Sequence, residues 1–112
     1  MMANVLIIDH RQTRRVKIRS ALDIRAGDCI EDVSGVSKDD VESARYDYVV
    51  VHYSNAEAQY IENEAWSLGD AKIVFFSGSF SSPREHCEGV TYASEAALLA
   101  MLPNLEAITS PF

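Results

Sequence analysis

Three uninterrupted apolar runs restrict the possible folds of this chain more than any other feature. They are the segments VLII, YVVV and IVFF, which begin at Val5, Tyr48 and Ile73 and are each followed by a polar residue. A run without polar alternation is typical of a strand that is buried on both faces of a sheet. Such a strand needs a layer of helices on each side, so the runs predict the interior of a parallel α/β sheet.

Helical patterns occupy the intervals between these runs. Apolar residues recur there every three or four positions, a polar residue suited to an N-cap precedes several of the segments, and glycine or proline follows where a helix would end. We therefore expect helices at 13–25, 38–45, 56–68 and 95–102, with Ser37, Asn55 and Ser94 as N-caps and with Gly27, Gly69 and Pro103 as stop signals.

Two further strands complete the expected sheet. Cys29 to Val33 is short and partly polar, as an edge strand is, and Val90 to Tyr92 is rich in β-branched and aromatic residues. The whole pattern predicts an α/β fold: a flavodoxin-like, doubly wound, five-stranded parallel sheet in the order 2-1-3-4-5. The interval after Ser77 is short and contains Pro83, so we expect a shortened fourth helix of about one turn between Arg84 and Glu88.

One domain accounts for the length of 112 residues, because this size suits a single hydrophobic core and no repeat or linker divides it. We assign residues 1–103 to the domain and 104–112 to a C-terminal tail. Cys29 and Cys87 belong to no CxxC pattern, so we expect both to be reduced thiols. The apolar runs are far shorter than the roughly 20 residues of a transmembrane helix and no signal-peptide pattern begins the chain, so we expect a cytoplasmic protein.

A ligand site in such a sheet is expected beyond the carboxyl ends of the strands, where the strand order reverses. In the order 2-1-3-4-5 this point falls between the first and third strands. Asp9 and His10 follow the first strand, His52 ends the third, and Ser77 ends the fourth nearby. These four residues form the candidate site.

The order of these segments resembles the receiver domain of two-component response regulators, the CheY-like family. The similarity rests on VLIIDHR, YDYVVVH, FFSGS and SEAALLAML, and it extends to about Leu102. In that family two acids after the first strand bind magnesium, and an aspartate at the end of the third strand accepts a phosphoryl group. A Thr or Ser after the fourth strand contacts that group, and a lysine after the fifth strand pairs with it.

The candidate site departs from the family at three of these five positions. Asp9 matches the first acid and Ser77 matches the hydroxyl, whereas His10 replaces the second acid and His52 replaces the acceptor, and no lysine follows Lys72. Magnesium prefers a near-octahedral shell of oxygen ligands, so we expect its site to be lost or weak, and we expect no other cofactor. The resemblance thus implies a pseudo-receiver that cannot form an aspartyl phosphate at the usual place.

Each of these side chains also has a plainer interpretation. Asp9 would accept hydrogen bonds from loop amides, His10 would be solvated, and His52 would be a neutral ring bonded to the backbone. Two active alternatives are a transition-metal site formed by all three side chains and phosphorylation of His52 itself. A P-loop, GxGxxG, GxSxG and the CxxxxxR loop do not occur, so we expect no enzyme.

The net charge of −7 conceals a basic first helix on an acidic body. His10 to Arg25 carries a formal +5, from six bases against Asp23, and the other residues carry −12, from four bases and sixteen acids. Nucleic-acid binding needs a wide positive face, so we expect neither a nucleic-acid nor a membrane partner. The expected partner is a signalling protein that contacts the basic helix or the reshaped face of the fourth helix, fifth strand and last helix. Phe80 is either a contact on that face or a core residue. A homodimer is a further alternative that the sequence leaves open.

Two functions remain open from the sequence. The first is a pseudo-receiver signalling domain that acts through phosphorylation-independent protein–protein interaction. The second is a switchable phosphorelay receiver that uses a non-standard acceptor, or a small ligand or metal, in the same pocket. An intact strand pattern with an altered pocket favours the first, while a purely architectural likeness to flavodoxin-like folds is a third interpretation.

Overall fold

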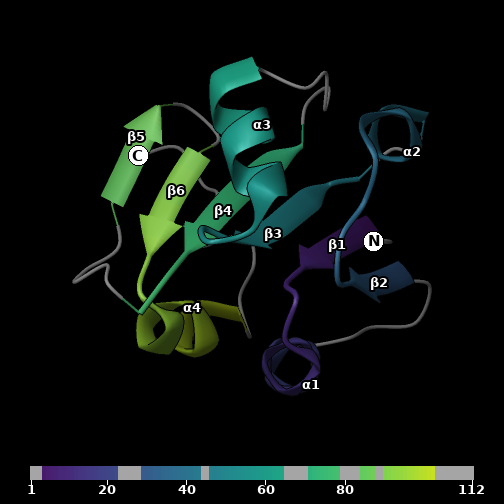
Figure 1. Ribbon diagram of the computed structural model, residues 1–112. Coiled ribbons are helices and arrows are strands. Elements are labelled where there is room, and N and C mark those ends of the chain that lie inside the picture. The colour runs from purple at the N-terminus through teal and green to yellow at the C-terminus, as the bar shows by residue number, and fades with distance from the viewer. Residues whose placement is uncertain are drawn as a thin grey trace.

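The computed structural model describes residues 4–22, 29–43, 46–64, 71–78, 84–87 and 90–102. These residues form one sheet with helices on both of its faces (Figure 1). Within them, no helix is both long enough and apolar enough to cross a bilayer. The elements in chain order are β1 (Asn4–Ile8), α1 (Gln12–Ala21), β2 (Cys29–Val33), α2 (Lys38–Ser43), β3 (Tyr48–His52), α3 (Ala56–Glu64), β4 (Lys72–Phe76), β5 (Arg84–Cys87), β6 (Val90–Ala93) and α4 (Glu95–Met101).

The sheet has the order β2-β1-β3-β4-β6-β5. Its first five members pair in parallel, and the register places Ile8 beside Val51 and His52 beside Phe76. This arrangement confirms the expected five-stranded parallel sheet, in which β6 is the fifth parallel strand. The strand order reverses between β1 and β3, so the switch point lies where the sequence pattern predicts it.

Alternate residues of each central strand enter two separate cores, which explains why the apolar runs contain no polar residue. Val5 and Ile7 pack with α1 and α4, whereas Leu6 and Ile8 pack with α2 and α3. Figure 1 shows α1 and α4 on one side of the sheet and α3 on the other. All four of these β1 side chains are almost completely buried, and burying an aliphatic side chain of this size stabilises a fold by about 1.5–3 kcal/mol.

The expected shortened fourth helix is wrong for Arg84–Cys87, which form strand β5. β5 pairs antiparallel with β6, and the register shifts between Glu85 and Cys87. The parallel sheet therefore gains a sixth, antiparallel strand at its edge, as mixed α/β sheets commonly do. Pro83, Phe80 and the tail 104–112 lie outside the described residues.

The helix boundaries agree with most of the expected signals. Ser37 Oγ accepts from the Asp40 amide at 3.3 Å and Ser94 Oγ accepts from the Ala97 amide at 3.1 Å, which confirms both as N-caps. Helix α1 ends at Ala21, four residues before the expected end at Arg25, because Leu22 already has an extended backbone. The stop signals Gly27, Gly69 and Pro103 and the ends of the expected helices at 38–45 and 56–68 lie outside the described residues.

Candidate functional site

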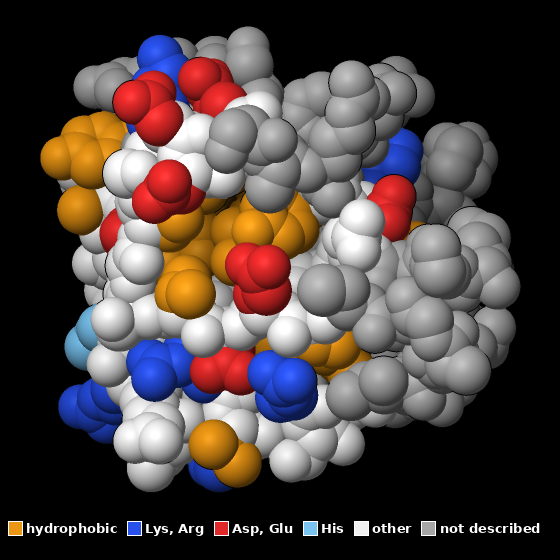
Figure 2. All heavy atoms as spheres, turned by 90° about the vertical axis from the view of Figure 1, so that its right-hand side faces the viewer, with side chains coloured by type: hydrophobic (Ala, Val, Ile, Leu, Met, Phe, Trp, Pro, Cys, Tyr) orange, Lys and Arg blue, Asp and Glu red, His pale blue; other side chains and the backbone are white. Residues whose placement is uncertain are grey.

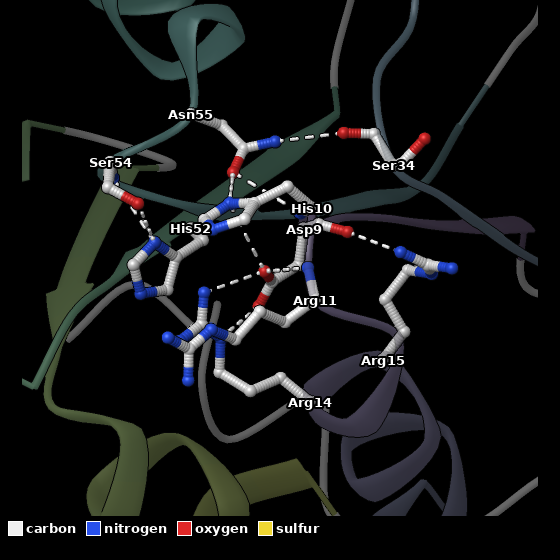
Figure 3. Close-up of polar contacts among 9 residues, drawn as sticks. All are labelled: Asp9, His10, Arg11, Arg14, Arg15, Ser34, His52, Ser54 and Asn55. Atoms are coloured by element: carbon white, nitrogen blue, oxygen red, sulfur yellow. Dashed lines mark hydrogen bonds and ion pairs between the residues drawn. The ribbon is translucent and has the colours of Figure 1, made fainter.

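Polar side chains from two segments, residues 9–14 and 52–55, meet at the carboxyl edge of β1 and β3 (Figure 3). Asp9 directly follows β1 and His52 ends β3, so the parallel register brings them to the same edge. Arg14 reaches this edge from α1, and Asn55 reaches it from the turn before α3. We call this group the switch-point cluster, and it consists of Asp9, His10, Arg14, His52, Ser54 and Asn55.

The Asp9 carboxylate is fully buried and is bonded from within the chain. Arg14 donates to it through Nε to Oδ2 at 2.6 Å and through Nη2 to Oδ1 at 2.9 Å. The Arg11 amide adds a third hydrogen bond to Oδ1 at 2.9 Å. A two-pronged arginine–carboxylate contact is among the strongest and most directional ion pairs in proteins. Both oxygens of the acid are thus occupied before any ligand arrives.

The charge of this pair is fixed by its surroundings. Burial alone would raise the pKa of Asp9, but the hydrogen bonds from Arg14 and the Arg11 amide outweigh it and hold the pKa below its usual value. The same hydrogen bond raises the pKa of Arg14 above its ordinary value. Asp9 is therefore an anion and Arg14 a cation, and each neutralises the other.

A second pairing uses two more bases of α1, Arg15 and Arg19. Arg15 Nη1 donates to the Asp9 backbone carbonyl at 2.7 Å, and Arg15 Nε donates to Asp32 Oδ1 at 3.3 Å. Arg19 Nη1 donates to the other oxygen of Asp32 at 2.6 Å. Arg14, Arg15 and Arg19 thus join α1 to the ends of β1 and β2. Their role in binding an outside partner is correspondingly reduced.

Asn55 connects the edge of β1 with the loop after β2. Its side chain is almost completely buried, and its Oδ1 lies 2.9 Å from His10 Nδ1 and 3.4 Å from the His10 amide. Its Nδ2 donates to the Ser34 carbonyl at 3.1 Å. Asn55 precedes α3 as expected, but its side chain bonds these two loops, so the predicted side-chain cap is wrong. Because Oδ1 only accepts, His10 Nδ1 carries the proton.

His52 stands at the strand end where the resemblance places a phosphoryl acceptor. The side chain is buried, and its Nδ1 lies 2.6 Å from Ser54 Oγ and accepts from the Ser54 amide at 3.2 Å. The ring packs edge-on against Phe76 at 5.0 Å and against His10 at 6.1 Å between centroids. Burial, followed by the nearby Arg14 cation, lowers the pKa of His52 below its usual value. His52 is therefore a neutral imidazole at pH 7, with its proton on Nε2.

The structure brings Asp9, His10 and His52 together, as the topology predicts. Ser77 lies at the end of the next strand, β4, where its amide donates to the Ala93 carbonyl of β6 at 3.1 Å. Sequence reasoning missed Arg14, Ser54 and Asn55 as members of the cluster. A signal for Arg14 was present, because α1 begins at Gln12, soon after Asp9, and side chains in the first turn of a helix tilt back towards its N-terminus.

The transition-metal alternative is not supported by the geometry. Among the residues that the structure describes, no three His, Cys, Asp or Glu side chains gather in a way that could hold a metal ion. The physical reason is that Asp9 is bonded to Arg14, while the Nδ1 atoms of His10 and His52 face Asn55 and Ser54. The Asp9 carboxylate and both Nδ1 atoms therefore already have partners in the chain.

Comparisons of the chain with protein-family models, with curated proteins and with solved structures find no match. Function is therefore inferred from the geometry of the site and from the fold.

Proposed function

We propose that this chain is a pseudo-receiver: a receiver-like signalling domain that binds a protein partner without being phosphorylated. The five parallel strands in the order 2-1-3-4-5 support this proposal at the level of the fold. The observation that carries it is the Arg14 guanidinium on the buried Asp9 carboxylate.

That contact opposes magnesium binding on physical grounds. A magnesium ion would have to displace a cation that already satisfies both oxygens of Asp9. The Arg14 side chain is only 17% exposed in its present position, so its displaced guanidinium would need either a new partner or a path to water. Magnesium also gives up its own water reluctantly and usually needs more than one carboxylate. Asp9 is the one carboxylate of the switch-point cluster.

The protonation and hydrogen bonds of His52 also argue against phosphorylation of this chain. An imidazole accepts a phosphoryl group through a nitrogen lone pair. Nδ1 of His52 directs its lone pair at the two donors of Ser54, and Nε2 of the neutral ring carries the proton. The nearby Arg14 is already paired with Asp9, and neither ring nitrogen of His52 offers an unoccupied lone pair to a phosphoryl donor.

A partner surface remains on the outer side of α1. Arg14, Arg15 and Arg19 are bonded to acids of the body, while Val16 is 56% exposed and Lys17 is exposed beside it. An exposed apolar side chain next to a lysine suits an acidic partner with an apolar contact. The basic first helix is therefore still the proposed contact, and its contacting residues are Val16 and Lys17 on the outer side.

The proposal is tested by incubating the full chain with acetyl phosphate and magnesium and measuring the intact mass. A phosphorylation-competent receiver domain in the same tube serves as the positive control. We expect the control to gain a phosphoryl group and this chain to stay unmodified. A stoichiometric adduct on this chain that hydroxylamine removes would instead support the switchable receiver. A complex with a partner protein that forms equally with and without the phosphodonor would support the pseudo-receiver.

A further inference from the structure

The two histidines of the switch-point cluster use their Nδ1 atoms in opposite ways. His52 Nδ1 accepts from the Ser54 amide at 3.2 Å and also lies 2.6 Å from Ser54 Oγ. His10 Nδ1 instead donates to Asn55 Oδ1 at 2.9 Å. A proton taken up by His52 must therefore go to Nδ1 and turn this acceptor into a donor, whereas in His10 it goes to Nε2 and leaves the role of Nδ1 unchanged.

This change of role removes the contact between His52 and the backbone of the next turn. The Ser54 hydroxyl can rotate and accept from a protonated Nδ1, but the Ser54 amide can only donate. The amide would then lie opposite a second donor. Because Ser54 is exposed, its backbone can turn outwards and donate to water instead.

The charges around His52 oppose a proton at this place. The titratable and charged side chains near its ring are Arg14 of α1, Asp9 and His10 directly after β1, and Glu95 of α4. Burial lowers the pKa of His52 most, Arg14 and then His10 lower it further, and the two carboxylates raise it by less. The closed turn therefore disfavours the protonated ring.

The two histidines also differ in their access to water. His52 is buried, whereas 56% of the His10 side chain is exposed. Figure 2 shows a histidine at the surface, beside Lys and Arg side chains at the lower left of that view. Water solvates a charge on His10, so a proton there leaves its hydrogen bond intact and provides a control within the same cluster.

The turn after His52 holds two other segments in place. The Asn55 amide donates to the His52 carbonyl at 3.0 Å. The Asn55 side chain is bonded to His10 at the edge of β1 and to the Ser34 carbonyl in the loop after β2. Since Ser54 lies between His52 and Asn55 in the chain, a rotation of its backbone also moves Asn55.

We propose that residues 53–55 form a pH-sensitive turn: a proton on Nδ1 of His52 releases Ser54 and breaks the hydrogen bonds of Asn55 with the edge of β1 and the loop after β2. The turn is closed at neutral pH, and mild acid opens it while the sheet stays folded. The closed turn has its full stability above about pH 6.5 and loses it as the pH falls. This proposal is independent of the pseudo-receiver function, because it involves neither a phosphoryl group nor a partner protein.

Ring ¹⁵N chemical shifts of the labelled full chain test the first step without a substitution. At neutral pH, Nδ1 of His52 should have the shift of a nitrogen with a lone pair, and Nδ1 of His10 that of a protonated nitrogen. The amide shifts of Ser54 and Asn55 should change with the midpoint of the His52 ring. A protonated Nδ1 in His52 at neutral pH, or amide shifts that follow the His10 ring, would contradict the proposal.

Hydrogen exchange measures the opening itself, as protection relative to the intrinsic exchange rate at each pH. We expect the protection of the Ser54 and Asn55 amides to fall by up to about tenfold per pH unit below about pH 6.5. It should stay below the protection of β3 at every pH, because the opening is local. Protection of the turn that does not depend on pH, or that equals the protection of β3 throughout, would overturn the proposal.

Two matched substitutions separate the roles of the histidines. His52→Asn places an amide oxygen near the position of Nδ1, where it can accept from the Ser54 amide at every pH, so we expect the pH dependence of the turn to disappear. His10→Asn places an amide nitrogen where Nδ1 donates to Asn55, and it should retain the pH dependence. Retention in His52→Asn, or loss in His10→Asn, would show that another group controls the turn and would overturn the proposal.

Discussion

Helix α1 pairs with two carboxylates that lie in different environments. Asp9 is fully buried and bonded by both prongs of Arg14, whereas the Asp32 side chain is 28% exposed and shared between Arg15 and Arg19. The chemistry of the two pairs is the same. A buried charge that loses its partner is strongly destabilising, while a surface pair contributes little because water and salt replace it. Because of this difference in burial, we call Asp9–Arg14 the closed pair and the contacts of Asp32 with Arg15 and Arg19 the brace.

The largest expected effect is at the closed pair. Arg14→Met keeps an apolar stem but leaves the Asp9 carboxylate buried without its cation, so we expect a loss of about 3 kcal/mol in the free energy of unfolding. Urea denaturation measures this loss. Lys17→Met, an exposed position on the same helix, is the control and should change stability by less than about 0.5 kcal/mol. A loss below about 1 kcal/mol for Arg14→Met would remove the distinction between the two pairs.

Asn55→Leu tests the hydrogen bonds that the Asn55 side chain contributes to the switch-point cluster. The substitution leaves the Ser34 carbonyl and the His10 amide without the partner that Asn55 supplies, so we expect a loss of about 2 kcal/mol by urea denaturation. Gln59→Leu makes a similar change at an exposed position of α3 and should have an effect near zero. If the two variants were equally stable, Asn55 would not hold the edge of β1 to the loop after β2.

His52 predicts a pH dependence with a definite sign. Its pKa is below the usual value of 6.5 in the folded state, so the unfolded chain binds the proton more readily. Stability from this group is complete above about pH 6.5 and is lost as the pH falls towards the folded pKa, by at most about 1.4 kcal/mol per pH unit. His52→Gln should remove this slope and His10→Gln should retain it. A ring titration by NMR with a midpoint above 6.5 would reverse the sign and contradict the neutral state.

The smallest effect is expected at the brace. In Arg19→Met, Arg15 still contacts Asp32, so we expect a loss of about 0.5 kcal/mol or less that shrinks further at high salt. Urea denaturation at low and high ionic strength measures it. A loss as large as that of Arg14→Met would mean that burial does not separate the two pairs.

Most of the parallel sheet could be predicted because its signals are local. The runs at Val5, Tyr48 and Ile73 and the caps at Ser37 and Ser94 depend on neighbouring residues alone. Strand β5 could not be predicted in this way. Its sequence REHC has no alternation of apolar and polar residues, and its strand conformation depends on pairing with β6.

The position of the candidate site could be predicted from the sequence, but the charges and ion pairs of its side chains could not. The topology brings Asp9, His10 and His52 to one edge, since carboxyl ends of parallel strands meet there. Which base of α1 neutralises Asp9 depends on the rotation of the helix over the sheet, and that is set by the packing of Ile18 and Leu22. The charge state of the site is a tertiary property, so the basic strip suggested a partner surface where the fold uses an internal ion pair.

The closed state of Asp9 is measured most directly by its side-chain ¹³C chemical shift, titrated from neutral pH into strong acid with and without magnesium. The Arg14 contact predicts a midpoint below 3.8, the ordinary pKa of this group, that magnesium does not move. A midpoint at or above 3.8, or a chemical shift at neutral pH that follows the magnesium concentration, would show an open carboxylate and contradict the pseudo-receiver.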